Sequence, residues 1–444
     1  MYQPWKFLIY IAADNVLYEN AQVSLREITD SCLLSDVEII AQIDGPTAAM
    51  ATRYNCQKGS KRLTWVAPEN YTPDRGDRLR DFLNAAAANI NPHQRILLVL
   101  WGEGNGLDHI YFYGDPEDSN PQPPEVNANR YVKDIELGSI LFEFTQKLGR
   151  PIDVLGFDAC KMAMAEICYE VRESVSIVVG SDEQIPKESW PYERLLRDLA
   201  RFPGMNASTL STLIVSRYVE KYKVPGKSDR VSLSAMNLSG SDELAAATRR
   251  LVQAFEAVAG DLSGKRRIFR ARDASRTADD TSYIDFGVFC EELMDSFDEH
   301  TPVHASAKSV LFALKNHAYI QYHRYTGEDR SFIPYGLSLY FPQALPPDAC
   351  GLDAPQSEFT FATHEALAGM KDPPHSKKDP PHSKKDPPHS KKSPRGAGQA
   401  PMEITSYYVL WNSYVPLEFN QVTGWADFLA RVLADDSDQE GAAA

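Results

Sequence analysis

Residues 152–162 read IDVLGFDACKM, an apolar run that ends in the cysteine Cys160. Residues 96–106 read ILLVLWGEGNG, a second apolar run that ends in a glycine-rich turn. Continuous apolar runs of this length are typical of strands that are buried on both faces of a parallel sheet. Because chemistry in such sheets collects at the carboxyl ends of the strands, the two runs predict a cysteine nucleophile site at one sheet edge.

Strands and helices are predicted to alternate along the first half of the chain. Apolar runs predict strands at 5–13, 37–44, 95–102, 152–159 and 176–184, and helical spacing is found at 17–31, 76–90, 134–148 and 161–173. This alternation predicts an α/β fold in which helices cover both faces of a mainly parallel sheet. The second half is less regular, with helices predicted at 208–222, 242–260 and within 284–297, and strands at 230–238 and 335–342.

The length, charge and cysteine content of the chain disfavour several functions. With 444 residues, the chain suits one enlarged α/β domain or two domains that share a sheet. Its formal net charge of −15 disfavours nucleic-acid binding, which normally needs a basic face, and is compatible with cationic substrates or partners. Six cysteines without a CxxC pair indicate neither a zinc site nor a dense disulfide framework.

No segment predicts passage into or across a membrane. The N-terminal MYQPWKFLIYIAADN lacks the features of a signal peptide and is interpreted as a first core strand. No apolar stretch approaches about 18 residues, the length that a spanning helix needs. We therefore expect a cytoplasmic protein without a membrane partner.

A low-complexity segment interrupts the last part of the chain. The sequence KDPPHSK occurs three times from Lys371. Paired prolines prevent helix and sheet pairing, and the segment has few apolar side chains to bury. We predict a flexible loop over 350–403, a C-terminal element packing on the core at 404–436 and a disordered tail at 437–444. The loop is either a solvated spacer or a protease-sensitive or partner-binding loop that offers Lys-Lys pairs.

Seven segments occur in the order typical of a known family. They are YIAADNVLYENAQVSLREI, IIAQIDGPTAAMATRY, LVLWGEGNG, LGFDACKMAMAEICYEV, VGSDEQIPKESWPY, YGLSLYFP and GWADFL. With this set the chain resembles clostripain-like cysteine peptidases of the caspase-like clan, over nearly its whole length except the repeat loop. The resemblance implies a caspase-like three-layer α/β/α sandwich with a core at 1–205, which the half at 206–349 completes.

The resemblance also implies roles for individual residues. Cys160, which follows Phe-Asp-Ala, takes the position of the nucleophile, and Glu103 occupies the position of the catalytic histidine. The backbone around Gly104, together with the N–H of Cys160, would bind a tetrahedral oxyanion. Asp158 and Glu188 would line a pocket for Lys or Arg before the cut, because carboxylates in a partly enclosed pocket select a cationic side chain. Independently, Asp158 lies two residues before Cys160, so the two side chains should share one face.

The carboxylate at position 103 is unfavourable for catalysis. A thiol with an ordinary pKa of about 8.5 is mostly protonated at neutral pH, and a neighbouring imidazolium would lower that pKa. An ionised glutamate has the opposite effect, and it is a poor proton donor at pH 7. We therefore predict that peptide hydrolysis is weak or absent, whether Glu103 is natural or introduced. The alternative is a pseudoprotease that holds a basic peptide or a partner protein without cutting it.

Another histidine could serve as the base in a different thiol hydrolase. His109, six residues after Glu103, is the nearest histidine, although an exposed loop histidine is the simpler interpretation. His93 precedes the strand and should lie at the opposite end of the sheet. Nothing in the sequence supports a role for the repeat-loop histidines His375, His382 and His389.

No cofactor is required by these interpretations, and calcium is possible because members of the family can need it. The loop 114–125 is acidic but lacks the regular spacing of an EF-hand, so a solvated loop is the simpler interpretation. The expected partners are protein or peptide substrates that contain Lys or Arg. Since relatives mature by internal cleavage, an upstream protease acting on residues 371–395 is a further possible partner.

Overall fold

The computed structural model describes the chain between residues 4 and 434 with gaps. The described residues are 4–32, 37–68, 75–104, 106–107, 132–223, 231–277, 282–316, 319–326, 333–346, 349 and 411–434. The predictions for His109, the acidic loop 114–125, the repeat loop 350–403 with its histidines, and the tail 437–444 lie outside the described residues.

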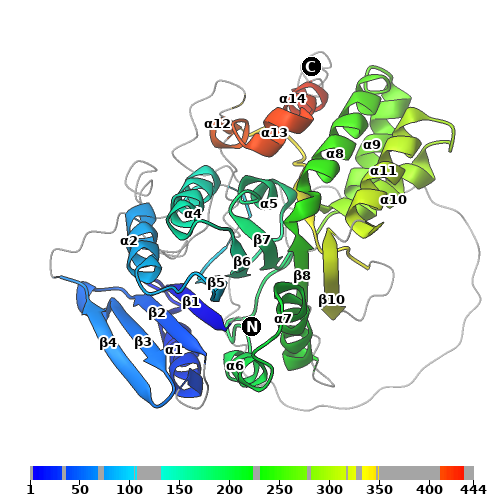
Figure 1. Cartoon of the computed structure of the whole chain (residues 1–444). Coiled ribbons are helices and arrows are strands. Elements are labelled where there is room, and N and C mark those ends of the chain that lie inside the picture. Colours follow the sequence, from blue (N-terminus) through cyan, green and yellow to red (C-terminus); the bar gives the residue numbers. More distant parts are fainter. Residues whose placement is uncertain are drawn as a thin grey trace, which may run out of the picture.

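A nine-stranded sheet runs through the molecule in the order β10-β8-β7-β6-β5-β1-β2-β3-β4 (Figure 1). The five central strands, which are β7, β6, β5, β1 and β2, pair in parallel. Within the described sheet, β3 and β8 run against the other strands. The strands are β1 (Trp5–Ala12), β2 (Glu38–Asp44), β3 (Thr52–Gln57), β4 (Ser60–Val66), β5 (Arg95–Trp101), β6 (Ile152–Asp158), β7 (Val175–Gly180), β8 (Val231–Asn237) and β10 (Ile320–Thr326). A separate pair joins β9 (Tyr283–Asp285) and β11 (Ser338–Tyr340).

Helices cover both faces of the sheet, which confirms the predicted α/β architecture of mainly parallel strands (Figure 1). On β1, Leu8 and Tyr10 belong to the core cluster shared with α2, α4 and α5, whereas Phe7 and Ile9 belong to the cluster shared with α1, α6 and α7. The alternation is the ordinary consequence of successive strand side chains pointing to opposite faces. The helices are α1 (Tyr18–Cys32), α2 (Arg75–Ala87), α4 (Asp134–Leu148), α5 (Ala165–Glu170), α6 (Tyr192–Arg201), α7 (Ala207–Tyr222), α8 (Ser241–Glu256), α9 (Leu262–Ala274), α10 (Phe286–Ser296), α11 (Pro302–Asn316), α12 (Trp411–Tyr414), α13 (Glu418–Thr423) and α14 (Trp425–Ala434), with 3-10 turns at Ala48–Met50 and Leu238–Gly240.

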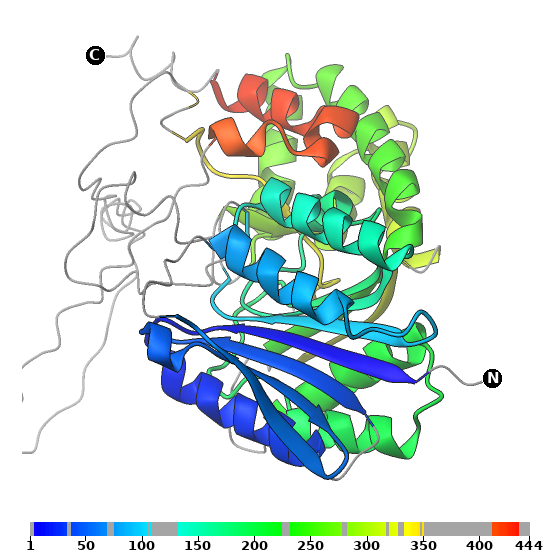
Figure 2. The same ribbon diagram turned by 60° about the vertical axis from the view of Figure 1, so that its left-hand side comes forward.

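The last three helices pack on the core at the end of the molecule away from the β3–β4 hairpin (Figure 2). Arg172, just after α5, donates to both carboxylate oxygens of Glu418 at 2.8 and 2.6 Å. The Trp425 indole is fully buried and donates to the carbonyl of Tyr340 at 2.8 Å. A two-pronged ion pair and a buried aromatic anchor therefore hold this end of the chain against the core.

The structure departs from the predicted elements at several places, and α6, α9, α11 and β10 are among the elements that were not predicted. The helix predicted at 161–173 is shorter and begins at Ala165. Residues 161–163 instead bond to the segment after β7, through Lys161 N–H to the Glu183 carbonyl and Ala163 N–H to the Ser181 carbonyl. The hairpin of β3 and β4 was not predicted at all. Across the part of the chain that the structure describes, none of the helices combines the length and apolar character that crossing a membrane requires.

Candidate active site

The tips of β5 and β6 lie side by side and carry the predicted site. Trp101 is the register partner of Asp158, so the residues that follow both strands leave the sheet at the same edge. The Gly102 N–H donates to the Asp158 carbonyl at 3.2 Å, which extends the ladder by one bond. A cavity of about 370 Å³ opens there, lined by Leu17, Trp101, Gly102, Glu103, Gly104, Asp158, Cys160, Lys161, Gln184, Ile185, Pro186, Lys187 and Ser189. The structure thus brings Glu103, Gly104, Asp158 and Cys160 to one cavity.

Gly104 is packed directly against the backbone of Cys160. A Cβ at position 104 would lie 2.3 Å from the Cys160 carbonyl oxygen and 2.9 Å from its backbone nitrogen. Both distances are far below van der Waals contact, so a glycine is needed for the two turns to meet. This close approach places the backbone at Gly104 beside the N–H of Cys160, where the oxyanion site is predicted.

We expect Gly104→Ala to destabilise the protein by about 1–3 kcal/mol, because the added methyl must push the two strand tips apart. Chemical unfolding measures this loss. The rate at which Cys160 is alkylated should also differ between this variant and the unaltered chain. Gly204→Ala is the matched control, since a Cβ there meets no atom within 4 Å. Equal stability of the two variants would contradict the packing of Gly104 on Cys160.

Cys160 is half-buried, and the loop after β7 contacts its thiol. The Ile185 N–H donates to the Cys160 sulfur at 3.2 Å. Burial is the main reason that the pKa of the Cys160 thiol is raised to about 12. The negative charge of Glu103 raises that pKa as well, whereas the Ile185 N–H and the Lys161 ammonium lower it. The thiol is therefore in its protonated, weakly nucleophilic form at neutral pH.

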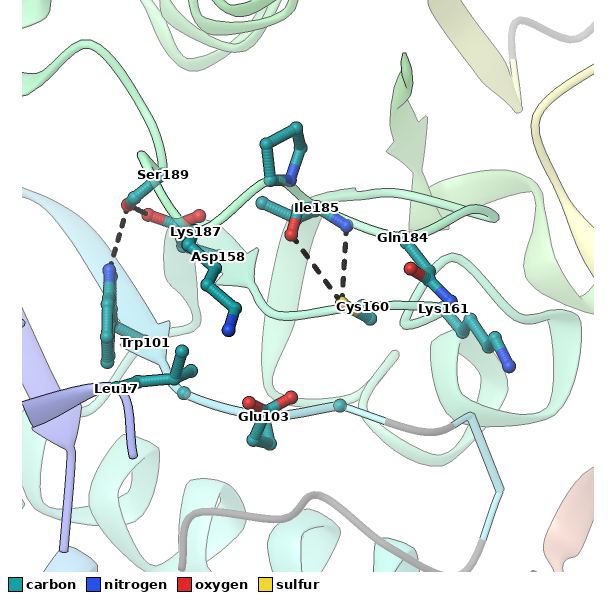
Figure 3. A pocket seen from close by; sticks show the side chains of 13 residues that line it. Leu17, Trp101, Glu103, Asp158, Cys160, Lys161, Gln184, Ile185, Lys187 and Ser189 are labelled. Carbon is teal, nitrogen blue, oxygen red and sulfur yellow. Dashed lines mark hydrogen bonds between the residues drawn. The ribbon is translucent and has the colours of Figure 1, made fainter. Parts of the chain in front are cut away.

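Glu103 lies in the turn after β5 and faces the cavity from the side opposite Ile185 (Figure 3). The glutamate and the thiol thus share one cavity, and the carboxylate disfavours the thiolate through its charge. Among the described residues that line this cavity, none is a histidine. His93 lies just before the first residue of β5, at the opposite end of that strand, as the sequence predicts.

Asp158 is buried, with 3% of its surface exposed, and its two oxygens have different surroundings. Oδ2 accepts hydrogen bonds from the Tyr192 hydroxyl at 2.6 Å, the Trp190 N–H at 3.2 Å and the Ser189 hydroxyl. Oδ1 is also buried, and no described residue donates to it. Burial raises the pKa of the Asp158 carboxyl to about 6, while the three hydrogen bonds act in the opposite direction. A buried carboxylate oxygen without a donor is a ready acceptor for a cationic ligand.

Glu188 is placed differently from Asp158. Its side chain is exposed and does not line the cavity. Lys221 on α7 donates to the backbone carbonyls of Glu188 and Ser189 at 2.5 and 3.0 Å, so this lysine holds the backbone at residues 188–189 in place. Lys187 does line the cavity, and Figure 3 shows its side chain reaching from the loop toward the space between Trp101 and Cys160.

Several contributors to the site were not predicted from the sequence, and three of them lie in one segment. They are the Ile185 N–H on the thiol, the Ser189 hydroxyl and the Tyr192 hydroxyl on Asp158. The segment IPKESWPY carries all three, and its place a few residues after β7, which neighbours β6, is the signal that could have indicated them. Within the described residues, no cluster of three or more His, Cys, Asp or Glu side chains is arranged to hold a metal ion.

Known proteins show the same architecture. The sequence profile of the clostripain family (peptidase C11) matches residues 9–346. The chain belongs to the clostripain family. This clostripain-family chain is therefore placed among cysteine proteases, whose substrates are proteins or peptides. No curated protein matches its sequence.

Two solved structures illustrate the fold of this clostripain-family chain. An inactive zymogen of a C11 protease from Parabacteroides distasonis is 18% identical, with a TM-score of 0.54, over 77% of this chain and 93% of that one. A secreted C11 cysteine protease from Bacteroides thetaiotaomicron, in complex with an irreversible peptide inhibitor, is 20% identical, with a TM-score of 0.55, over 76% and 92%. At these identities the likeness establishes the shared α/β fold.

Proposed function

We propose that this chain is a clostripain-like cysteine endopeptidase framework whose pocket takes Lys or Arg before the cut. In this proposal Cys160 is the nucleophile, and Glu103, in place of the catalytic histidine, leaves peptide hydrolysis weak or absent. The observation that carries the proposal is the buried Asp158 carboxylate, with Oδ1 lacking a donor among the described residues, in the same cavity as Cys160.

The basic specificity rests on the chemistry of Asp158. Its carboxyl has a pKa of about 6, so it is ionised at neutral pH despite its burial. An ionised carboxylate inside a cavity attracts a cation more strongly than one in open solvent, because water screens the charge less. A Lys or Arg side chain entering from the Cys160 side would supply the missing hydrogen bond.

The expectation of weak hydrolysis rests on the protonated state of the Cys160 thiol. With its pKa raised to about 12, the Cys160 thiol is almost entirely protonated at pH 7. Glu103 places a carboxylate, and not an imidazole, where the amine leaving group needs a proton donor. Both the attack and the departure of the leaving group are therefore slow.

The proposal is tested by the peptidase activity of the unaltered chain beside Cys160→Ala. Fluorogenic peptides that end in Lys, Arg or norleucine serve as substrates under reducing conditions, with and without calcium. We expect no turnover of any peptide above the Cys160→Ala background. Rapid, Cys160-dependent cleavage after Lys or Arg would contradict the inactivation, and rapid cleavage after norleucine would contradict the basic pocket.

A pseudoprotease is the second candidate function. The observation in its favour is that the Asp158 pocket keeps an acceptor for a cation while the thiol beside it is protonated. Such a protein would bind Lys- or Arg-containing peptides equally well before and after alkylation of Cys160 by a small reagent. Binding that is lost in Cys160→Ala would contradict this second function.

A further inference from the structure

We propose that the Asp158 pocket selects lysine over arginine, because the Ser189 and Tyr192 hydroxyls and the Trp190 N–H together occupy one of the two carboxylate oxygens. This inference rests on the proposed function, because it specifies which cation the basic pocket takes. Ser189 is 3% exposed and adopts a backbone φ of +63°, in the left-handed region where glycine is favoured. A serine at this position places a hydroxyl in the wall of the cavity.

The Ser189 hydroxyl is fixed between two neighbours, as Figure 3 shows. It accepts a hydrogen bond from the Trp101 indole N–H at 2.8 Å and donates its own proton to Asp158 Oδ2. Since a hydroxyl has a single proton, this direction leaves it no donor for a ligand. The serine therefore occupies an acceptor position of Asp158 Oδ2 and offers no hydrogen-bond donor to a ligand in the pocket.

Oδ2 of Asp158 is fully engaged by the protein. It accepts from three donors, which are Ser189, the Trp190 N–H and the Tyr192 hydroxyl. Oδ1 has no donor among the described residues. A ligand in the cavity thus meets a carboxylate that offers one oxygen and not two.

Lysine and arginine use carboxylates differently. The guanidinium is a planar fork that binds best when two of its N–H groups meet both carboxylate oxygens, whereas the ammonium of lysine is a compact charge that can use a single oxygen. In this pocket an arginine would lose one arm of the fork and leave a buried N–H without an acceptor. A lysine would satisfy Oδ1 and lose nothing.

The surrounding charges agree with a compact cation. Lys221 does not line the cavity. Its ammonium donates to the carbonyls of Glu188 and Ser189, so it does not occupy Oδ1 of Asp158. Its charge and that of Lys187, which lines the cavity, reduce the net negative potential there. Recognition therefore depends on the hydrogen-bond geometry at Asp158 more than on total charge.

The test compares three ligands on the full-length chain by titration calorimetry at pH 8. They are acetyl-Leu-Lys-amide, acetyl-Leu-Arg-amide and acetyl-Leu-norleucine-amide. We expect the lysine ligand to bind about tenfold tighter than the arginine ligand, the fold-change expected for one charge-assisted hydrogen bond. The double variant Ser189→Ala with Tyr192→Phe should remove most of that preference, because Oδ2 then accepts only from the Trp190 N–H. Ser189→Ala alone is the matched control, since Oδ2 still accepts from the Trp190 N–H and the Tyr192 hydroxyl.

Each outcome of this test has one meaning. Equal or tighter binding of the arginine ligand by the unaltered chain overturns the lysine preference and leaves the basic pocket of the proposed function standing. An unchanged Lys-to-Arg ratio in the folded double variant overturns the role of the occupied oxygen Oδ2. If neither basic ligand binds better than the norleucine ligand in any of the three proteins, the proposed function itself fails.

Discussion

Replacing Glu103 with histidine should raise the hydrolysis of peptides that end in Lys by about 10³-fold or more, because members of a catalytic pair act as a unit. The substitution removes the carboxylate that raises the pKa of the Cys160 thiol. It also supplies an imidazole that can take the thiol proton and return it to the leaving amine. Gly104 already packs on Cys160, so the new side chain projects from a turn that touches the nucleophile. The measurement is kcat/KM with its pH profile, beside the unaltered chain.

Glu103→Gln separates the two effects of Glu103→His, which are the removal of the carboxylate and the addition of an imidazole. It removes the negative charge without adding a base, so alkylation of Cys160 should become faster while peptide hydrolysis stays at background. The double variant Glu103→His with Cys160→Ala should be inactive. A folded Glu103→His protein that cuts neither Lys nor Arg peptides would show that position 103 is not the missing half of the site.

Replacing Asp158 with asparagine should abolish the discrimination between basic and neutral ligands, a loss of about 10²-fold in relative affinity when a buried ion pair is removed. Asparagine keeps one oxygen for the three donors that Oδ2 now serves and presents an amide where the ligand needs an acceptor. Competition between the lysine and norleucine ligands measures this loss. An unchanged preference for the lysine ligand would place the cation site elsewhere.

The same substitution should not destabilise the protein at pH 8. The pKa of Asp158 is raised from 3.8 to about 6 in the fold, so the native state binds this proton more tightly than the unfolded chain does. The free energy of unfolding therefore falls as the pH rises from about 4 to about 6, and it stays lower above that range. Asparagine removes this penalty, so we expect Asp158→Asn to be more stable at pH 8 by up to about 3 kcal/mol, with the gain vanishing near pH 4.

Asp285→Asn is the matched control for this stability measurement. Asp285 is also a buried carboxylate, but both of its oxygens accept backbone N–H groups, from Val288 on one side and from Tyr335 and Gly336 on the other. Burial raises the pKa of Asp285 as well, to about 7, so Asp285→Asn also removes a pH-dependent penalty. Since an amide cannot replace both acceptors, Asp285→Asn should be less stable at pH 8 than Asp158→Asn and should keep the ligand preference. Equal stability of the two variants would contradict a donor-free Oδ1 at Asp158.

The strand tips were predictable because their signals are local and strong. The runs at 96–101 and 152–158 are apolar throughout, which is the pattern of strands buried on both faces, and each is followed by the residues that form the site. The β3–β4 hairpin was missed because its strands, TRYNCQ and SKRLTWV, carry polar and charged side chains at a sheet edge. Edge strands need charged residues that discourage further pairing, and these hide the strand pattern.

The details of the pocket could not be derived from the sequence. The exposed position of Glu188 and the buried position of Ser189 depend on the path of one loop, in which Ser189 adopts a left-handed backbone and its N–H bonds to the Pro186 carbonyl. A run of adjacent polar residues does not indicate which of them faces inward when the backbone turns. The motif identified the segment, but only its fold decides that Ser189 reaches Asp158.

The attachment of α12–α14 has a consequence for any nick in residues 350–410. A cut there would separate two polypeptides in sequence, yet the Arg172–Glu418 pair, the Trp425 anchor and the Tyr414 hydroxyl bond to Glu166 do not involve the severed stretch. The shorter, C-terminal fragment would stay bound to the longer fragment as a non-covalent subunit. Such a protein would migrate as two bands in detergent and as a single particle in native buffer.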